Sequence, residues 1–240
     1  MSDTNAKNYH GGYMKDFKKF GFTLAEVLIT LGVIGVVAAI TMPTLIQNYR
    51  KKQVAVQLQK AYSEISQAIK LSEIDNGPLK DWNYQTAFNG ENAADFTDKY
   101  LVPYLKIIKN CRNQAGCMNG DVYSLSGLKN TTYTNDSTSH IVLSSGNVVG
   151  VTLGGTFASL HVVINNKKDK IYMGKDVFFF AINGENSGNF TTAGANIDNE
   201  ELKTDAYGCN QVQSDGAGMS CSTVIMRNGW EIPDDYPVRF

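Results

Sequence analysis

A run of twenty residues without a charged side chain, residues 27–46, constrains the fold of this 240-residue chain more than any other feature. As an α-helix rising about 1.5 Å per residue it would reach about 30 Å, the thickness of the hydrocarbon core of a bilayer. A core helix of a soluble protein would carry a polar stripe, and none is visible here. Gly32, Gly35 and Pro43 lie within the run, as membrane helices tolerate. We predict a transmembrane helix that is kinked or softened at Pro43.

The segment before this run is hydrophilic and basic. Residues 1–21 contain four lysines and two aspartates, a net charge of +2. A secretory signal peptide would combine such a start with a shorter apolar segment and a small-residue cleavage site behind it, and neither is present. These features predict an uncleaved anchor, unless the chain is processed before the span.

Four cysteines decide the predicted orientation, because basic residues flank both ends of the span equally. Cys111 and Cys117 are six residues apart, and Cys209 and Cys221 are twelve apart. This spacing favours two local disulfides in an oxidising compartment; four buried thiols are the alternative. The spacing is unlike that of a zinc site. We expect the body of the chain to face the periplasm or the exterior, with the basic leader in the cytoplasm.

Glu26 stands at the head of the apolar run. A charge on a lipid-exposed helix costs a few kcal/mol, which favours a functional role. An interfacial carboxylate near a positive helix N-terminus is the other interpretation. If the chain were cut between Gly21 and Phe22, the new amine would lie one helical turn from Glu26. In an assembly, the Glu26 carboxylate of one chain could then neutralise the amine of another and offset the cost of burying both charges.

The segment KKFGFTLAEVLITLGVIGVVAAITMPTLI resembles the processing and assembly segment of type IV pilins and type II secretion pseudopilins. The matching residues are the basic stretch, Gly21, Phe22, Glu26 as the fifth residue after the cut, Gly35 and Pro43. The resemblance implies that a membrane prepilin peptidase cuts after Gly21 and methylates the amine of Phe22, which keeps its charge. It also implies that Glu26 and Pro43 serve the assembly of a filament.

Further expectations concern location and partners. The resemblance implies a single-pass protein of the bacterial inner membrane that later enters a periplasmic pseudopilus or a cell-surface pilus. The implied partners are copies of itself, the prepilin peptidase and an inner-membrane assembly platform. A net charge of −1 and a pI near 6.3 argue against a nucleic-acid partner. We favour the type II secretion-like label, while secretion, motility, DNA uptake and adhesion stay open as roles.

The pattern changes after the span. Apolar residues recur every three or four positions up to the stop signal Asn76-Gly77-Pro78, which predicts a helix from about 22 to 75. Short segments rich in Val, Ile, Phe and Tyr follow, separated by Gly and Asn turns, and predict an antiparallel meander. The predicted strands are 121–126, 140–144, 148–153, 157–164, 170–173 and 177–182. The last of these lacks alternation, so we expect it to be a central strand covered on both faces.

Together these patterns predict an α+β, pilin-like fold. Its parts are a cleaved leader (1–21), a transmembrane and assembly helix (22–46), an amphipathic continuation (47–77) and a globular head (78–240). Within the head we expect short helices that bury aromatic residues, best placed at 94–109. Loops are expected at 183–220, and a short helix at 222–228. The resemblance makes Cys209–Cys221 the disulfide that bounds a C-terminal loop in many pilins.

No enzyme class is indicated. The chain has three histidines, and it lacks the metalloprotease, serine hydrolase and phosphate-loop motifs. We interpret His161 as a packed strand residue. Carboxylates that could gather around calcium are Asp198, Glu200, Glu201, Asp205 and Asp215, without EF-hand spacing. A solvated acidic loop with no cofactor is the default. The leading hypothesis is a structural filament subunit, and the alternative is a membrane-tethered binding protein that never polymerises.

Overall fold

The computed structural model describes residues 21–240 except 85–86, 134, 167–168 and 186–187. The predicted leader lies outside the described residues apart from Gly21. Contacts divide the chain into two units, Met1–Leu45 and Ile46–Phe240, which we describe separately. Helix α1 (Leu24–Asn76) runs through the end of the first unit into the second, so the helix predicted from 22 to 75 is confirmed.

The first unit consists, where described, of the apolar half of α1. None of its side chains from residue 24 to 45 is buried. Among the described residues, α1 is the one helix long and apolar enough to cross a membrane. Two polar groups in this half find partners in their own helix: the hydroxyl of Thr30 donates to the carbonyl of Val27 (3.0 Å), and that of Thr41 to the carbonyl of Val37 (2.9 Å). Such bonds make polar side chains compatible with an apolar surrounding.

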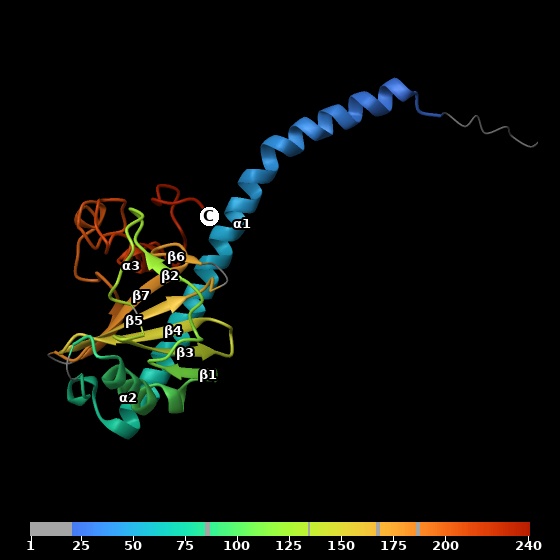
Figure 1. Cartoon of the computed structure of the whole chain (residues 1–240). Coiled ribbons are helices and arrows are strands. Elements are labelled where there is room, and N and C mark those ends of the chain that lie inside the picture. The colour runs from blue at the N-terminus through green and yellow to red at the C-terminus, as the bar shows by residue number, and fades with distance from the viewer. Residues whose placement is uncertain (1–20, 85–86, 134, 167–168, 186–187) are drawn as a thin grey trace, which may run out of the picture. The chain divides into compact units, whose positions relative to one another are not determined.

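The second unit is built on a six-stranded sheet, in which every neighbouring pair is antiparallel (Figure 1). In spatial order the strands are β1 (Ile107–Arg112), β3 (Thr138–Leu143), β4 (Val148–Leu153), β5 (Phe157–Val163), β7 (Val177–Asn183) and β8 (Asn189–Thr192). A tight turn with Gly146 at φ 86° links β3 to β4. The predicted α+β fold with an antiparallel sheet is confirmed.

Two of the predicted strands do not belong to this meander. Strands β2 (Asp121–Tyr123) and β6 (Lys170–Tyr172) pair with each other in parallel and form a small separate sheet. Each is only three residues long and lies between connecting segments, so the two can pair away from the main sheet. The meander therefore passes from β5 directly to β7.

Two edge strands appear where other structure was expected. Strand β1 occupies the end of the stretch expected to be helical at 94–109, and the helix α2 lies earlier, at Gly90–Tyr100. Pro103 explains the early end, because it has no N–H to donate and its ring would clash with the carbonyl four residues earlier in an α-helix. A short 3-10 turn, η2 (Val102–Tyr104), follows. Strand β8 opens the stretch expected to be loop at 183–220.

Short helices complete the second unit. They are η1 (Leu79–Asp81), η3 (Glu201–Lys203) and α3 (Cys221–Arg227). The helix α3 matches the short helix predicted at 222–228. The expected burial of aromatic residues is confirmed around α2, where the Trp82 ring stacks on Tyr100 at 4.4 Å between centroids and meets Phe96 at 5.9 Å.

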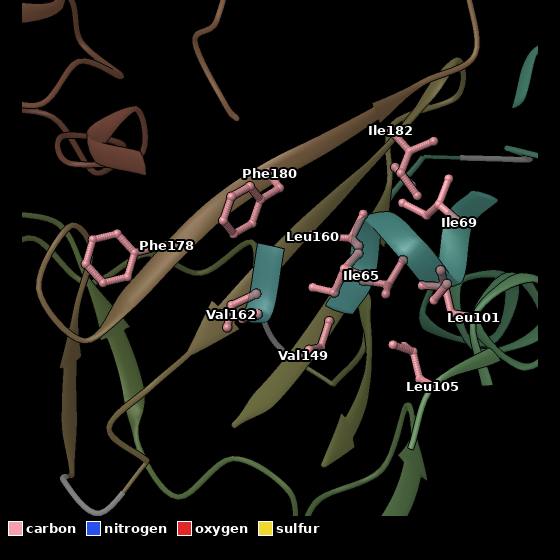
Figure 2. Packing of buried hydrophobic residues seen from close by; sticks show 14 of the residues in the cluster. Ile65, Ile69, Leu101, Leu105, Val149, Leu160, Val162, Phe178, Phe180 and Ile182 are labelled. Atoms are coloured by element: carbon pink, nitrogen blue, oxygen red, sulfur yellow. The ribbon is translucent and has the colours of Figure 1, made fainter. Parts of the chain in front are cut away.

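One face of the sheet packs on the amphipathic half of α1. Figure 2 shows Ile65 and Ile69 of α1 in the same apolar cluster as Leu160 and Ile182 of the sheet. The α1 residues buried here are Ala55, Leu58, Ala61, Ile65, Ala68, Ile69 and Ser72. Fully burying each large aliphatic side chain stabilises the fold by about 2 kcal/mol. The predicted apolar stripe is therefore a core face.

The other face of the sheet carries a second apolar cluster. It contains Val148, Val163, Val177 and Phe179 of the sheet and Ile171 of β6. Strand β7 thus contributes Phe179 to this cluster, whereas Phe178 and Phe180 belong to the first. This confirms that residues 177–182 are covered on both faces. The strand is not central, however, because only β8 separates it from the sheet edge.

Two histidines lie buried in a row across this second face. The register places His140, Gly150, His161 and Phe179 opposite one another on β3, β4, β5 and β7. The two imidazole rings are 5.5 Å apart between centroids, and none of their nitrogens has a hydrogen-bond partner among the described residues. The interpretation of His161 as a packed strand residue is confirmed, and His140 shares its environment.

This pair makes the head sensitive to acid. Burial lowers the pKa of His140 to about 4, and burial together with the neighbouring His140 lowers the pKa of His161 well below 6.5. Below pH 6.5 the two imidazoles therefore bind protons in the unfolded chain but not in the folded chain, so the folded state loses stability. We expect the free energy of unfolding to drop between pH 6.5 and 4, with His140 alone accounting for about 3 kcal/mol.

Urea unfolding measured at several pH values tests this expectation. Replacing both histidines by leucine, which does not titrate, should flatten the profile between pH 6.5 and 4. A double variant with the same pH slope as the original chain would show that carboxylates, and not this pair, cause the acid sensitivity.

Candidate functional site

The predicted processing site lies directly before helix α1. Gly21 and Phe22 precede its first residue, and the Phe22 side chain is 89% exposed. A Cβ added to Gly21 would meet no atom within 4 Å. The bond between the two residues is therefore free of packing against the described part of the chain, as a bond cut by another protein must be.

Glu26 lies in the first turn of α1, where it forms a reciprocal capping arrangement with Thr23. The Glu26 carboxylate accepts hydrogen bonds from the Thr23 backbone N–H (2.8 Å) and hydroxyl (2.9 Å). In return, the Thr23 hydroxyl accepts from the Glu26 backbone N–H (3.2 Å). This capping box satisfies two donors that a helix N-terminus leaves open, and it places a negative charge at the positive end of the helix dipole.

Sequence reasoning missed the role of Thr23, although its signal is present. The spacing Thr23-x-x-Glu26 before an apolar run is the pattern of a capping box. Because Thr23 holds the Glu26 carboxylate beside the helix start, the acid is oriented toward the end of the helix at which the amine of Phe22 would appear after cleavage. Pro43, the other predicted assembly residue, lies within α1 and seventeen positions from Glu26.

The glycines of the apolar half do not pack against the described part of their own chain. A Cβ at Gly32 or Gly35 would meet no atom within 4 Å. Small residues on membrane helices allow other helices to approach closely. These positions therefore leave room on the helix surface that the described part of this chain does not use.

Both predicted disulfides are present, Cys111–Cys117 and Cys209–Cys221. The second one anchors the loop 209–221 to α3, which is itself fixed to the sheet by hydroxyl groups. Ser222 donates to the carbonyl of Phe179 (2.5 Å), and Thr223 donates to the carbonyl of Ala193 (2.6 Å). The loop is thus tied to the end of the sheet formed by β7 and β8.

The first disulfide lies where β1 ends, next to an ionic contact with α2. Arg112 follows Cys111 with a positive φ of 51°, and its guanidinium contacts the carboxylates of Asp95 (2.7 Å) and Asp98. These groups are partly exposed, so the pairs contribute modestly to stability. The ion pairs tie β1 to α2, and the disulfide closes the loop that follows β1.

Three of the five calcium candidates have carboxylates engaged in local contacts. The Asp198 carboxylate accepts from the backbone N–H groups of Glu200 (2.9 Å) and Glu201 (2.8 Å), Glu200 pairs with Lys203 (2.9 Å), and Asp205 accepts from the N–H of Tyr207 (2.7 Å). Across the described residues no group of three or more His, Cys, Asp or Glu side chains is arranged to hold a metal ion. Calcium binding by this loop stays a prediction.

Comparisons with known proteins divide the chain near the end of its apolar run, between residues 42 and 44. Residues 16–42 match the prokaryotic N-terminal methylation motif. Residues 44–240 match a family described as a family of unknown function, DUF6613. Searches of curated proteins and of solved structures give no significant match. The motif match contains Gly21, Phe22 and Glu26, and it supports the resemblance to type IV pilins and pseudopilins.

Proposed function

The chain belongs to the family of unknown function DUF6613, and its prokaryotic N-terminal methylation motif makes it a type IV pilin-like protein of the prepilin-processed class. From this class we propose that it serves as a structural filament subunit. In this proposal a prepilin peptidase removes residues 1–21 and methylates Phe22. The chain waits in the inner membrane with its head in the periplasm. An assembly platform then extracts it into a pilus or a type II secretion-like pseudopilus.

The observation that carries the proposal is the bare apolar half of α1. Large side chains such as Leu28, Ile34 and Ile40 are all more than 60% exposed, and the other large apolar side chains of this half are exposed as well. An apolar surface of this length needs lipid or other protein around it. Copies of the same helix can provide that surrounding, and repeating one heterologous contact generates an open helical fibre.

Glu26 is given a specific role in this assembly. As each copy enters the fibre, its carboxylate meets the amine of Phe22 on a neighbouring copy, so that neither charge is buried alone. Thr23 keeps the carboxylate turned toward the helix start.

A Glu26→Gln variant is therefore expected to be processed normally but to enter filaments at less than about one tenth of the original level, because an unpaired buried charge costs several kcal/mol. Quantitative immunoblots of the membrane and sheared fractions measure this ratio. Glu64→Gln, which removes an acid from the same helix outside the apolar half, is the matched control. Equal incorporation of the Glu26 and Glu64 variants would contradict the assigned role.

The experiment that tests the function as a whole combines two measurements. Mass spectrometry of the N-terminus should find a methylated Phe22, and the protein should be recovered in filaments sheared from cells or in a pseudopilus fraction. An intact Met1 would instead support the alternative, a membrane-tethered binding protein. A processed chain confined to the membrane under conditions of active assembly would contradict polymerisation.

A further inference from the structure

A groove of about 510 Å³ opens beside α1 at the start of the second unit. Its walls come from four places in the sequence: α1 between residues 50 and 57, residues 164–165 directly after β5, the turn that leads into β7 at residues 175–176, and Phe240. Val54, Ile164 and Phe240 form an apolar wall, and Arg50 and Lys175 bring two cations. The groove thus combines an apolar surface with positive charge.

Two of the three charged side chains that line this groove are cationic, and one is a carboxylate. Within the described part of the chain neither Arg50 nor Lys175 forms an ion pair. The groove also contains Asp176, but this residue is buried and its carboxylate accepts hydrogen bonds from the amide of Asn165 (3.3 Å) and the backbone N–H of Tyr172 (3.1 Å). An anion in the groove would therefore meet two cations that form no ion pair within the described part of the chain, while the Asp176 carboxylate is engaged in its own hydrogen bonds.

A neighbouring cation shows the contrast. Lys51, next to Arg50, donates to the carbonyl of Pro233 (3.2 Å) and contacts the carboxylate of Asp234 (3.4 Å). Lys52 is exposed and lies outside the groove. Of the consecutive basic residues Arg50, Lys51 and Lys52, Arg50 lines the groove, and it forms no ion pair within the described part of the chain.

One residue of the groove, Arg50, lies close in sequence to the predicted membrane span. Arg50 follows Ile46, the last residue of the apolar run, by four positions, which is about 6 Å along a helix. Basic residues just outside a span attract anionic lipid headgroups. A free phosphate would use only the two cations, whereas a phospholipid could also cover Val54, Ile164 and Phe240 with its glycerol backbone and first acyl carbons.

We propose that this groove, the Arg50–Lys175 groove, binds the headgroup of an acidic phospholipid from the bilayer that holds α1. The lipid phosphate lies against Arg50 and Lys175, and the apolar wall contacts the adjoining part of the lipid. Such a lipid fixes the head at the membrane surface before assembly and is released when the chain is extracted. The inference rests on the membrane-anchored state of the proposed function.

The test uses the full-length chain in nanodiscs of phosphatidylcholine with or without phosphatidylglycerol. Flotation with vesicles of the same lipids first establishes that the chain is anchored. Native mass spectrometry after release into mild detergent then measures which lipids stay bound. We expect phosphatidylglycerol to be retained about tenfold over phosphatidylcholine. Both lipids carry a phosphate, but phosphatidylcholine also carries a choline cation that Arg50 and Lys175 would repel.

Charge-matched variants separate the groove from general basic attraction. Arg50→Gln with Lys175→Gln should abolish the tenfold preference. Lys52→Gln with Lys60→Gln removes the same charge from exposed positions of α1 outside the groove, and it should leave the preference intact. Circular dichroism of both double variants confirms that the head is folded.

Three results would overturn the proposal. They are equal retention of the two lipids, an equal loss of preference in both double variants, and displacement of the bound lipid by millimolar inorganic phosphate, which would identify a simple anion site. A chain that floats but shows any of these results refutes the groove alone. A chain that does not float refutes the anchored state, and the groove proposal with it.

Discussion

Replacing Gly21 by leucine is expected to leave the basic leader, residues 1–21, attached and the protein held in the membrane. In the proposed function, the peptidase must bring the backbone on both sides of the Gly21–Phe22 bond into its active site, and a glycine allows the closest approach. Because a Cβ at this position meets no atom of the described chain within 4 Å, the substitution should leave the fold unchanged. Processing should fall to an undetectable level.

Intact-mass measurement of the membrane fraction reads out this prediction directly, since the leader changes both mass and charge. Gly32→Ala is the matched control: its Cβ also meets open space, but the residue lies beyond the predicted cut, so cleavage should proceed. Normal cleavage of the Gly21→Leu chain would contradict the prediction that cleavage occurs between Gly21 and Phe22.

Replacing Gly150 by alanine is expected to lower the free energy of unfolding of the head by about 3 kcal/mol. An added Cβ would lie 2.0 Å from Nε2 and 2.1 Å from Cε1 of His161. The imidazole cannot move aside easily, because it packs among the rings of Tyr133 (5.0 Å), His140 (5.5 Å) and Phe179 (5.8 Å). The sheet or the ring must shift, and a well-packed core resists both.

A double-mutant cycle identifies the cause. In a His161→Ala background the added methyl group has room, so the same Gly150→Ala change should cost little, and the coupling between the two sites should be strongly favourable. Urea unfolding followed by tryptophan fluorescence gives the four free energies. An equal cost of Gly150→Ala in both backgrounds would mean that the backbone, and not the histidine ring, requires glycine here.

Much of the fold can be predicted because its strongest signals are local. Helix α1 combines an uninterrupted apolar run with a periodic stripe and ends at Asn76. Strands β3, β4 and β5 are linked by short glycine-containing turns, which fix antiparallel pairing. The parallel pairing of β2 with β6 joins residues about fifty positions apart and has no local signal.

The missed edge strands have a different cause. Strand β8 pairs with a single neighbour, β7, and its sequence NFTT offers little apolar alternation. Strand β1 has polar residues at three of its six positions and contains two irregularities in its register with β3. An edge strand, which pairs with one neighbour, can form with few apolar residues. Its structure is then decided by tertiary pairing and not by local sequence.

The candidate sites divide in the same way. Gly21, Phe22 and Glu26 follow from a contiguous motif, and Thr23 could have been added from its spacing to Glu26. The Arg50–Lys175 groove could not be predicted, because the fold brings together residues that are more than one hundred positions apart. The unpartnered histidine pair also depends on strand register.

The bonds from Thr30 and Thr41 to their own helix carry a consequence for how this protein changes surroundings. A hydroxyl that relied on a neighbouring molecule would have to lose that partner on leaving the bilayer and find another on arrival in a fibre. These two hydroxyls carry their acceptors with them, so the exchange of fatty acyl chains for sister subunits leaves their bonding unchanged. Extraction of the helix from the bilayer therefore breaks no hydrogen bond of these two hydroxyl groups.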